Sequence, residues 1–288
     1  MQHALIGLLA ETSIHAGAGK SAGVIDLPIM REAHTGWPCV YGSAVKGALR
    51  CRADQTPEAK DWLKDVFGPD TKNASEHAGA LSVGDARLLL LPVRSLTTHF
   101  KWVTCPALLA RAARDSARNG VSAPALALPK TIGDEVALVA GDASSLFLEE
   151  FHFKPEKTDL TGIIAWLAGF VAEADFAERL QAQLVIVNDD IFAHLAQYTT
   201  PVTPHVAIDN TRKTVIGGAF WYEETLPPET VLYVSLLASA ARSGKAEMSA
   251  SKVLQHALSL FPAEKPYLQL GGNETVGMGW CRVQKVEG

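Results

Sequence analysis

Residues 11–50 constrain the fold of this chain more than any other stretch. They follow a strand-like segment, residues 2–10, and begin as a glycine-rich loop. Pro28 excludes a helix through this loop, because proline donates no backbone hydrogen bond and clashes with the preceding turn. A helix is then predicted from about residue 42 to residue 52, with Ser43 as its N-cap. The chain must therefore pack a strand, a polar loop and a basic helix side by side.

The composition indicates a globular protein with a substantial core. The chain has 288 residues, of which 48% are hydrophobic, and this is enough for one large domain. The longest apolar run, residues 163–172, is interrupted by Gly169 and is shorter than the roughly 20 residues that cross a bilayer. The N-terminus lacks a signal-peptide pattern, and the four cysteines form no CxxC pair. We therefore expect a cytoplasmic protein with reduced thiols and no membrane partner.

Helix and strand patterns alternate irregularly along the rest of the chain. Helical patterns cover about residues 106–119 and 159–183, and the second is predicted to be the longest helix. Because no regular βαβ rhythm appears, the sequence favours an α+β fold with an antiparallel sheet over a doubly wound parallel sheet. Residues 121–145 are punctuated by Pro, Ala and Gly, and we predict a poorly ordered insertion there within a single domain, residues 1–288.

The segment Gly19-Lys20-Ser21 is similar to the end of a nucleotide-binding P-loop that follows a strand. That motif needs a glycine where Ile14 stands, and it continues into a helix, which Pro28 prevents. The sequence therefore argues against a nucleoside triphosphatase.

Asp26 and His15 lie on the glycine-rich loop and are candidate catalytic residues. A carboxylate beside a phosphate chain can hold a divalent cation or accept a proton from a ribose 2′-OH. The simpler interpretation is an aspartate that caps its own turn. His15 can orient or protonate a reacting group. Glu11 and Glu32 are further carboxylates, which the sequence alone does not place.

The segment GSAVKGALR, residues 42–50, indicates a helix that binds phosphate. A helix N-terminus offers free backbone N–H groups to an anion. Lys46 and Arg50 share one helix face, at positions i and i+4, and the small residues Gly42 and Gly47 let another backbone come close. The alternative is an ordinary solvated basic face.

Residues 202–224 predict two extended arms around a polar turn. Arg212 and Lys213 lie at the tip, and such a hairpin can project from the domain and insert beside stacked bases. In the alternative interpretation the arms are two ordinary sheet strands, with the aromatic residues 220–222 in the core.

The C-terminal loop GGNETVGMGW carries an unusual density of glycine. Its glycines are Gly271, Gly272, Gly277 and Gly279. Because each glycine costs backbone entropy on folding, a closely approaching ligand backbone is favoured over a plain turn.

The charge of the chain limits what kind of nucleic-acid protein it can be. The formal net charge is -5, whereas phosphate binding usually leaves a basic footprint. The charge argues against a protein that coats nucleic acid indiscriminately. It agrees with a groove that binds RNA through a few local cations while the opposite face stays acidic.

Four stretches of the sequence together resemble the repeat-associated mysterious protein (RAMP) superfamily, and specifically the backbone subunit of the Cmr-type, type III-B CRISPR effector complex. They are, in order, ETSIHAGAGKSAGVIDLPIMREAHTGWP, YGSAVKGALR, HVAIDNTRKTVIGGAFWYEE and LQLGGNETVGMGW. These stretches cover both ends and the third quarter of the chain. Their order and combination are specific, although each glycine-rich piece alone is generic.

This resemblance implies a ferredoxin-like or RRM-like antiparallel sheet core with helical insertions and a protruding β-hairpin thumb. It implies that many copies assemble into a helical filament along a guide RNA (crRNA), together with other Cmr-type subunits. In this family the thumb interrupts the duplex between the guide and the complementary target RNA at regular intervals.

The resemblance also implies roles for individual residues. Asp26 matches the family's loop aspartate for metal-dependent cleavage of target RNA, so a divalent ion, Mg²⁺ or Mn²⁺, is implied as cofactor. Lys46, and with it Arg50, matches the basic helix that contacts the guide backbone. The glycine-rich loop 271–279 supports the same RNA contact. Residues 121–145 match nothing in the family pattern.

Two other functions stay open at this point. One is a non-catalytic scaffold for guide RNA, in which Asp26 only shapes its loop. The other is a guide-processing ribonuclease that cuts repeat RNA by itself, for which His15 is the one obvious candidate.

Overall fold

The computed structural model describes residues 1–19, 23–70, 75–142, 144–243 and 248–287, so Lys20 and Ser21 of the P-loop-like segment lie outside the described residues. The strands are β1 (Gln2–Ala10), β2 (Cys39–Val40), β3 (Leu81–Val83), β4 (Ala86–Arg94), β5 (Phe100–Thr104), β6 (Val136–Val139), β7 (Leu146–Leu148), β8 (Phe151–Lys157), β9 (Leu184–Ile186), β10 (Val202–Asp209), β11 (Thr214–Glu224), β12 (Val231–Ala238), β13 (Tyr267–Gln269) and β14 (Trp280–Val286). The helices are α1 (Gly42–Asp54), α2 (Leu63–Phe67), α3 (Pro106–Arg118), α4 (Thr161–Ala168), α5 (Phe176–Gln183), α6 (Asp189–Tyr198) and α7 (Ala250–Leu258), with 3-10 turns η1 (Pro57–Ala59) and η3 (Glu274–Val276).

Most of the strands form one sheet. Its main path is β13-β14-β1-β12-β4-β5-β9-β6-β8-β7, and β2 and β3 pair with β4 and β12 beside that path. The pairs β5·β9 and β6·β8 are parallel, whereas the other strand pairs of this sheet are antiparallel. The prediction of a mixed fold with a largely antiparallel sheet is therefore confirmed.

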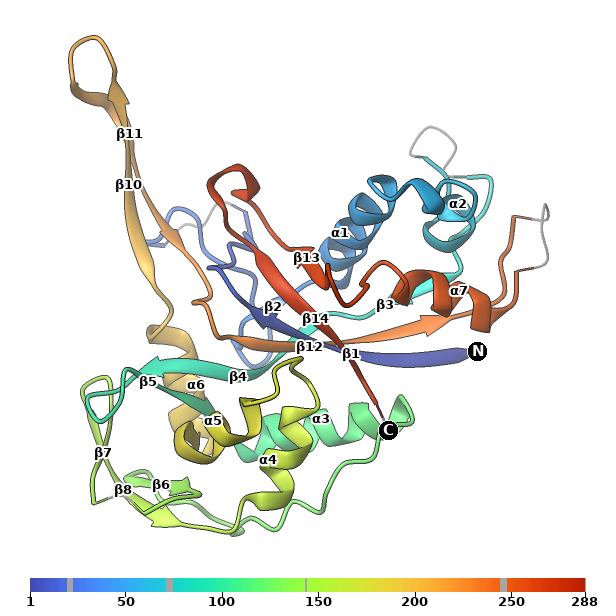
Figure 1. The fold of residues 1–288 in the computed structure, drawn as a ribbon. Coiled ribbons are helices and arrows are strands. Elements are labelled where there is room, and N and C mark those ends of the chain that lie inside the picture. The colour runs from blue at the N-terminus through green and yellow to red at the C-terminus, as the bar shows by residue number, and fades with distance from the viewer. Residues whose placement is uncertain (20–22, 71–74, 143, 244–247, 288) are drawn as a thin grey trace.

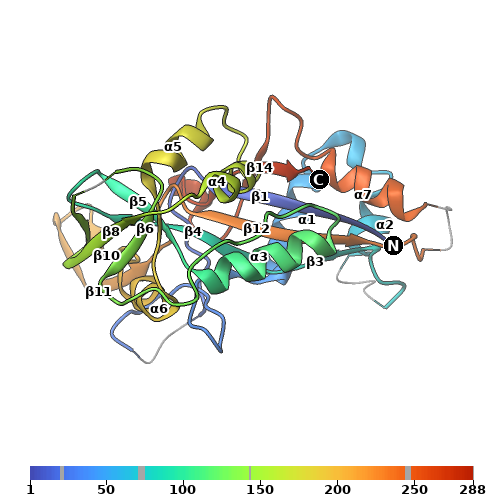
Figure 2. The same ribbon diagram turned by 90° about the horizontal axis from the view of Figure 1, so that it is seen from below.

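Helices cover both faces of this sheet. Figures 1 and 2 show α1, α2 and α7 on one side and α3, α4 and α5 on the other. The central strand β1 contributes to the core on both sides, because Ile6 and Leu8 pack with the first group while Leu5 and Leu9 pack with the second. A strand buried on both faces needs nearly continuous apolar residues, as in this one.

The segment predicted as the longest helix is in fact broken, and that prediction is wrong. Helix α4 ends before Gly169, and α5 begins at Phe176. Between them Phe170 is buried, and its carbonyl oxygen would lie 1.9 Å from a side-chain carbon placed on Gly7 of β1. The chain leaves the helical path because this turn packs directly on the sheet, and only glycine fits beneath it.

Residues 121–145 are tied to the domain in the structure. They supply strand β6, which pairs with both β8 and β9. Val121 and Ile132 are buried in the core beside α3. The preceding helix, α3, ends at Arg118, one residue before the predicted end, with Asn119 as its C-cap and Gly120 following at φ +75°.

None of the helices in the described ranges has the length and hydrophobicity needed to cross a bilayer. The four cysteines are free thiols, as predicted, and only Cys51 is exposed.

Candidate nucleic-acid interface

Strands β10 and β11 form a separate hairpin that projects from the body of the molecule (Figure 1). Its turn is held by Asp209, whose Oδ1 accepts hydrogen bonds from the N–H groups of Thr211 (2.8 Å) and Arg212 (3.0 Å). Arg212 and Lys213 are exposed at the tip. The structure therefore places these two predicted cations where a partner can reach them.

The aromatic residues of β11 lie outside the core, contrary to the alternative interpretation. Phe220 is 50% exposed and Tyr222 is 37% exposed. Because residues directly opposite in an antiparallel pair share a face, Phe220 and Tyr222 lie on one face with their partners Val206 and Pro204. On the other face His205 stacks on Trp221. The hairpin thus presents an exposed apolar face, which the described residues leave largely uncovered.

Asp26 lies at the root of this hairpin. Its side chain is exposed, and its Oδ2 accepts a hydrogen bond from the Tyr222 N–H at 2.8 Å. The next residue, Leu27, forms a parallel bridge with Glu223 and exchanges backbone hydrogen bonds with Tyr222 and Glu224. The aspartate therefore connects the early loop with a strand 196 residues away in the sequence.

Glu224 holds the two segments together, and sequence reasoning missed it. The side chain is buried, and its carboxylate accepts hydrogen bonds from the Ile29 N–H (3.0 Å), from Arg31 (2.5 Å) and from the Thr200 hydroxyl (2.6 Å). The signal that could have identified it is the pair of consecutive glutamates at the end of an aromatic strand, because a sheet rarely buries carboxylates without partners.

His15 joins the same cluster. Its Nδ1 lies 2.8 Å from the backbone oxygen of Glu224. A carbonyl oxygen only accepts, so Nδ1 carries a proton in this contact. The His15 backbone oxygen accepts from the Gly272 N–H at 2.8 Å. The histidine therefore links the early loop, the hairpin root and the C-terminal loop.

The glycines of the C-terminal loop have different structural reasons. A side-chain carbon on Gly271 would lie 2.3 Å from the His15 oxygen, and one on Gly279 would lie 2.1 Å from the Leu270 oxygen. Packing within the chain therefore accounts for these two. Gly277 needs only its positive φ of +84°, and Gly272 meets nothing closer than the His15 ring at 3.7 Å. The latter two leave an open surface.

The start of α1 differs from the prediction. Tyr41 occupies the N-cap position and its side chain does not cap the helix, so Ser43 is not the N-cap and lies exposed in the first turn. The Gly42 N–H instead donates to the Asp85 carboxylate at 2.7 Å. Gly42 packs against the Val83 oxygen, which brings the β3–β4 turn to this helix end. A carboxylate thus occupies the helix N-terminus that was predicted to receive phosphate.

Lys46 and Arg50 lie on one face of α1, and both side chains bind backbone oxygens. Lys46 Nζ donates to the Leu81 oxygen at 2.9 Å, and Arg50 Nη1 donates to the Gly68 oxygen at 2.7 Å. Burial lowers the pKa of Lys46, and the nearby Arg50 and Arg242 lower it further. Three cations therefore gather at this end of the interface.

Helix α1 and the C-terminal glycine-rich loop border a common cleft of about 60 Å³. Ala48, Cys51 and Gln55 of the helix face Glu274 and Trp280 across it. Helix α1 thus borders the C-terminal loop, this loop contacts His15, and His15 contacts the hairpin root. Asp26 is bonded to the hairpin root, whereas Lys46 bonds β3 and Arg50 bonds the residues after α2.

The two other carboxylates near the loop are already paired. Glu11 binds Arg282 at 2.6 Å, and Glu32 binds Arg111 at 2.6 Å. Among the described residues no three side chains of the metal-ligating types come together. Asp26, by contrast, forms no ion pair with any residue that the structure describes.

Two glycine substitutions are expected to change stability in opposite directions. Gly47→Ala should raise the free energy of unfolding by about 0.5–1 kcal/mol, because Gly47 is exposed inside α1 with nothing near a new methyl group. Gly279→Ala should lower it by about 1–3 kcal/mol, because a φ of +86° is strained for alanine and the Leu270 oxygen blocks the methyl. Urea unfolding measures both values. Equal signs would contradict this account of the two glycines.

Comparison with known proteins places this geometry in a family. Residues 8–282 match the RAMP superfamily model. The chain is 35% identical to the CRISPR system Cmr endoribonuclease Cmr4 of Pyrococcus furiosus over 289 residues, which cover 98% of this chain and 95% of the relative.

Solved structures share the fold over the full length. Oligomeric Cmr4 from Pyrococcus furiosus superposes with a TM-score of 0.74 at 28% identity, covering 100% of both chains. A chain of the type III-B Cmr-beta complex bound to cognate target RNA superposes with a TM-score of 0.78 at 24% identity, covering 99% of this chain and 98% of that one. Sequence match, full-length identity and fold agree, and the chain therefore belongs to the RAMP superfamily, with full-length similarity to Cmr4.

Proposed function

We propose that this chain is the backbone subunit of a type III-B CRISPR ribonucleoprotein, which binds guide RNA and cleaves complementary target RNA at regular intervals. The similarity over 98% of the chain to a protein named as a Cmr endoribonuclease supports this proposal. Its partners are guide and target RNA, further copies of itself in a helical filament and other Cmr-type subunits. Such a complex acts in the cytoplasm.

The observation that carries the proposal is the position of Asp26. Its exposed carboxylate accepts a hydrogen bond from Tyr222 at the root of the hairpin. A hairpin that interrupts a guide:target duplex splays a nucleotide beside its root. The carboxylate then lies where the distorted RNA backbone passes, and it can act on the 2′-OH there.

The chemistry needs few protein groups, because RNA carries its own nucleophile. Asp26 accepts the proton of the 2′-OH, and the 2′-oxygen forms a bond to the adjacent phosphorus. The bond from phosphorus to the 5′-oxygen breaks, and this oxygen takes a proton from water. The products are a 2′,3′-cyclic phosphate and a 5′-hydroxyl. His15 keeps the loop and the hairpin root aligned through the Glu224 oxygen.

We further propose that the RNA path runs from α1 to the hairpin. Lys46 and Arg50, with exposed Ser43, supply contacts to guide phosphates at one end, and Arg212 and Lys213 supply them at the tip. Gly272 and Gly277 leave room for the backbone between these ends. Base pairing to the guide then provides the sequence specificity.

The hairpin is proposed to act as the thumb on a ferredoxin-like core. Support comes from four adjacent antiparallel strands in the order β14-β1-β12-β4, with α1 following β1 in the chain and α7 preceding β14. This is the split βαβ arrangement of that core. The uncovered face formed by Phe220, Tyr222, Val206 and Pro204 supports insertion against bases.

We propose that Asp26 would hold a divalent ion, Mg²⁺ or Mn²⁺, at a site shared with the RNA. The described residues fit only such a shared site, because no three ligating side chains converge and magnesium often binds one or two carboxylates plus phosphates. When bound, the ion would neutralise developing phosphate charge.

Removal of divalent ions is expected to stop cleavage and to leave guide binding intact. The assay compares target cleavage by the assembled complex in EDTA, and after Mg²⁺ or Mn²⁺ is restored, with guide affinity measured in parallel. Cleavage that continues unchanged in EDTA would refute the shared site while leaving Asp26 as a base.

The direct test of the function uses the assembled complex with a labelled complementary RNA. We expect product lengths that differ by a constant interval, and no cutting of RNA without complementarity. Cutting of repeat RNA by the chain alone would instead support guide processing. Intact target in every condition would support the scaffold function. One structural observation favours that function, because Asp26 already forms a structural hydrogen bond.

A further inference from the structure

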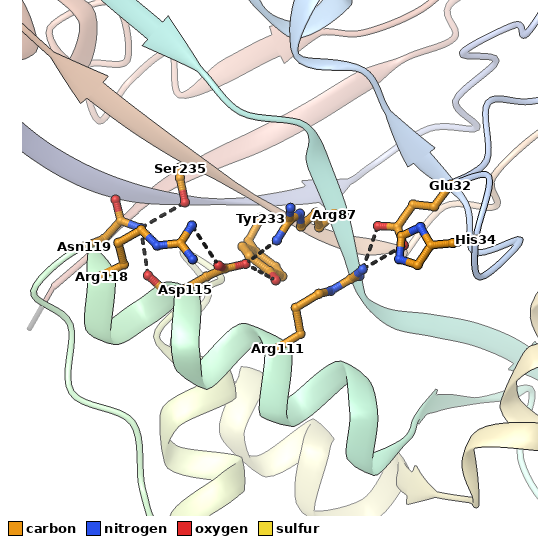
Figure 3. A network of polar contacts seen from close by, with 9 residues as sticks. All are labelled: Glu32, His34, Arg87, Arg111, Asp115, Arg118, Asn119, Tyr233 and Ser235. Carbon is orange, nitrogen blue, oxygen red and sulfur yellow. Dashed lines mark hydrogen bonds and ion pairs between the residues drawn. The ribbon is translucent and has the colours of Figure 1, made fainter.

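Helix α3 carries two separate polar clusters, which Figure 3 shows side by side. Asp115 binds Arg87 of β4 at 2.8 Å and the Tyr233 hydroxyl of β12 at 2.9 Å. Arg111 instead reaches Glu32, on the loop that continues from Asp26. The first cluster ties the helix to the sheet, and the second ties it to the candidate site.

We propose that Arg111 is a positioning residue for RNA cleavage, which holds the loop of Asp26 in register with the hairpin root. Arg111 acts through Glu32 and touches neither RNA nor Asp26. The inference rests on the proposed function, because it assigns the clamp to the same site.

Glu32 is the centre of the loop that Arg111 grips. Its Oε2 accepts from the Thr35 hydroxyl at 2.8 Å, and its backbone oxygen accepts from the Gly36 N–H at 2.8 Å. The Trp37 N–H donates to the Thr35 hydroxyl at 3.2 Å. These hydrogen bonds tie residues 35–37 of the loop to Glu32.

The form of the Arg111–Glu32 pair suits positioning better than stability. Arg111 Nη1 bonds both carboxylate oxygens, at 2.6 and 2.8 Å, and the guanidinium lies 5.0 Å from the centre of the Trp37 ring. The side chains are only 13% and 11% exposed. Arg111 Nε and Nη2 are nevertheless buried without a hydrogen-bond partner in the described part of the chain. Such a pair is costly to bury and adds little to stability, whereas it fixes the loop at one place.

Two consecutive residues of opposite charge anchor the loop in opposite directions. Arg31 binds Glu224 at the hairpin root, and it also donates to the Ala196 oxygen at the end of α6. Glu32 binds Arg111 on α3. The Asp26 side chain accepts a hydrogen bond from the Tyr222 N–H, and the backbone of the next residue, Leu27, bonds the same strand. The two anchors that follow in the chain add to these contacts and fix the far end of the loop.

The experiment compares Arg111→Met with Arg87→Met, a matched control on the other cluster of the same helix. Both variants remove the nearer arginine of a buried carboxylate, and Asp115 keeps only the more distant Arg118 at 3.5 Å among the described residues, so both should lower the melting temperature. Only Arg111→Met is expected to slow single-turnover target cleavage at saturating RNA, by on the order of 10–100-fold. Guide affinity should stay at the wild-type value in both.

A double variant, Glu32→Gln with Arg111→Met, separates positioning from folding. It removes both buried charges, so the melting temperature should recover, whereas the cleavage rate should stay low. It also carries the test if Arg111→Met alone does not fold.

Wild-type cleavage by Arg111→Met or by the double variant would overturn the inference, and so would equal slowing by Arg87→Met. Asp26→Asn is measured beside them. If Asp26→Asn is inactive and Arg111→Met is fully active, only this inference fails. If Asp26→Asn cleaves normally, the proposed catalytic role of Asp26 fails first.

Discussion

Asp26→Asn is expected to slow target RNA cleavage by about 10²–10⁴-fold, the range that a general base contributes. Asparagine has nearly the same shape, and its Oδ1 can still accept the hydrogen bond from the Tyr222 N–H. It cannot take the proton of the 2′-OH. The loop should therefore stay in place while the chemistry is lost, so guide affinity and melting temperature should equal those of the wild type.

The measurement is single-turnover cleavage of a complementary RNA by the assembled complex. Asp142→Asn is the control, since Asp142 is 85% exposed and pairs with Lys157 on the surface. Its cleavage rate should be that of the wild type. Normal cleavage by Asp26→Asn would leave the scaffold function as the better account of this chain.

Glu224→Ala is expected to destabilise the chain by about 3–5 kcal/mol, because it removes one partner of a buried ion pair and leaves the other charged. Glu224 and Arg31 are 3% and 16% exposed. The substitution also removes the acceptor of the Ile29 N–H and of the Thr200 hydroxyl. Without the Glu224 carboxylate, the Asp26 loop should lose its attachment to the hairpin root.

Urea unfolding of Glu224→Ala and Asp142→Ala provides the comparison. The exposed Asp142–Lys157 pair should contribute about 0–1 kcal/mol, because solvent screens it. If the two variants lose the same free energy, the Glu224 carboxylate does not hold the root as described. Since Glu224 lies so close to Asp26, cleavage by its variant is expected to fall as well.

The sequence predicted the parts of the site that depend on local patterns. The hairpin followed from two extended arms around a polar turn, and the loop with Asp26 followed from Pro28 and the glycines. Arg212 and Lys213 lie exposed at the tip as expected.

The parts that depend on distant contacts were beyond local patterns. The carboxylate of Asp85, from the turn between β3 and β4, accepts the Gly42 N–H at the start of α1. The residues around Ser43 do not reveal this distant acceptor, and Ser43 was therefore predicted as the N-cap. Phe170 breaks the long helix because Gly7 lies beneath it. Glu224 binds residues far away in the sequence, and no single window of the chain contains them.

The position of β14 in the sheet affects when the site can form during translation. β14 pairs with β1, the first strand, and the loop before it bonds the His15 backbone. Residues up to Gly272 must therefore leave the ribosome before the C-terminal loop, His15 and the hairpin root can meet. Half-made chains lack the finished RNA surface, so they are not expected to capture messenger or ribosomal RNA during their own translation.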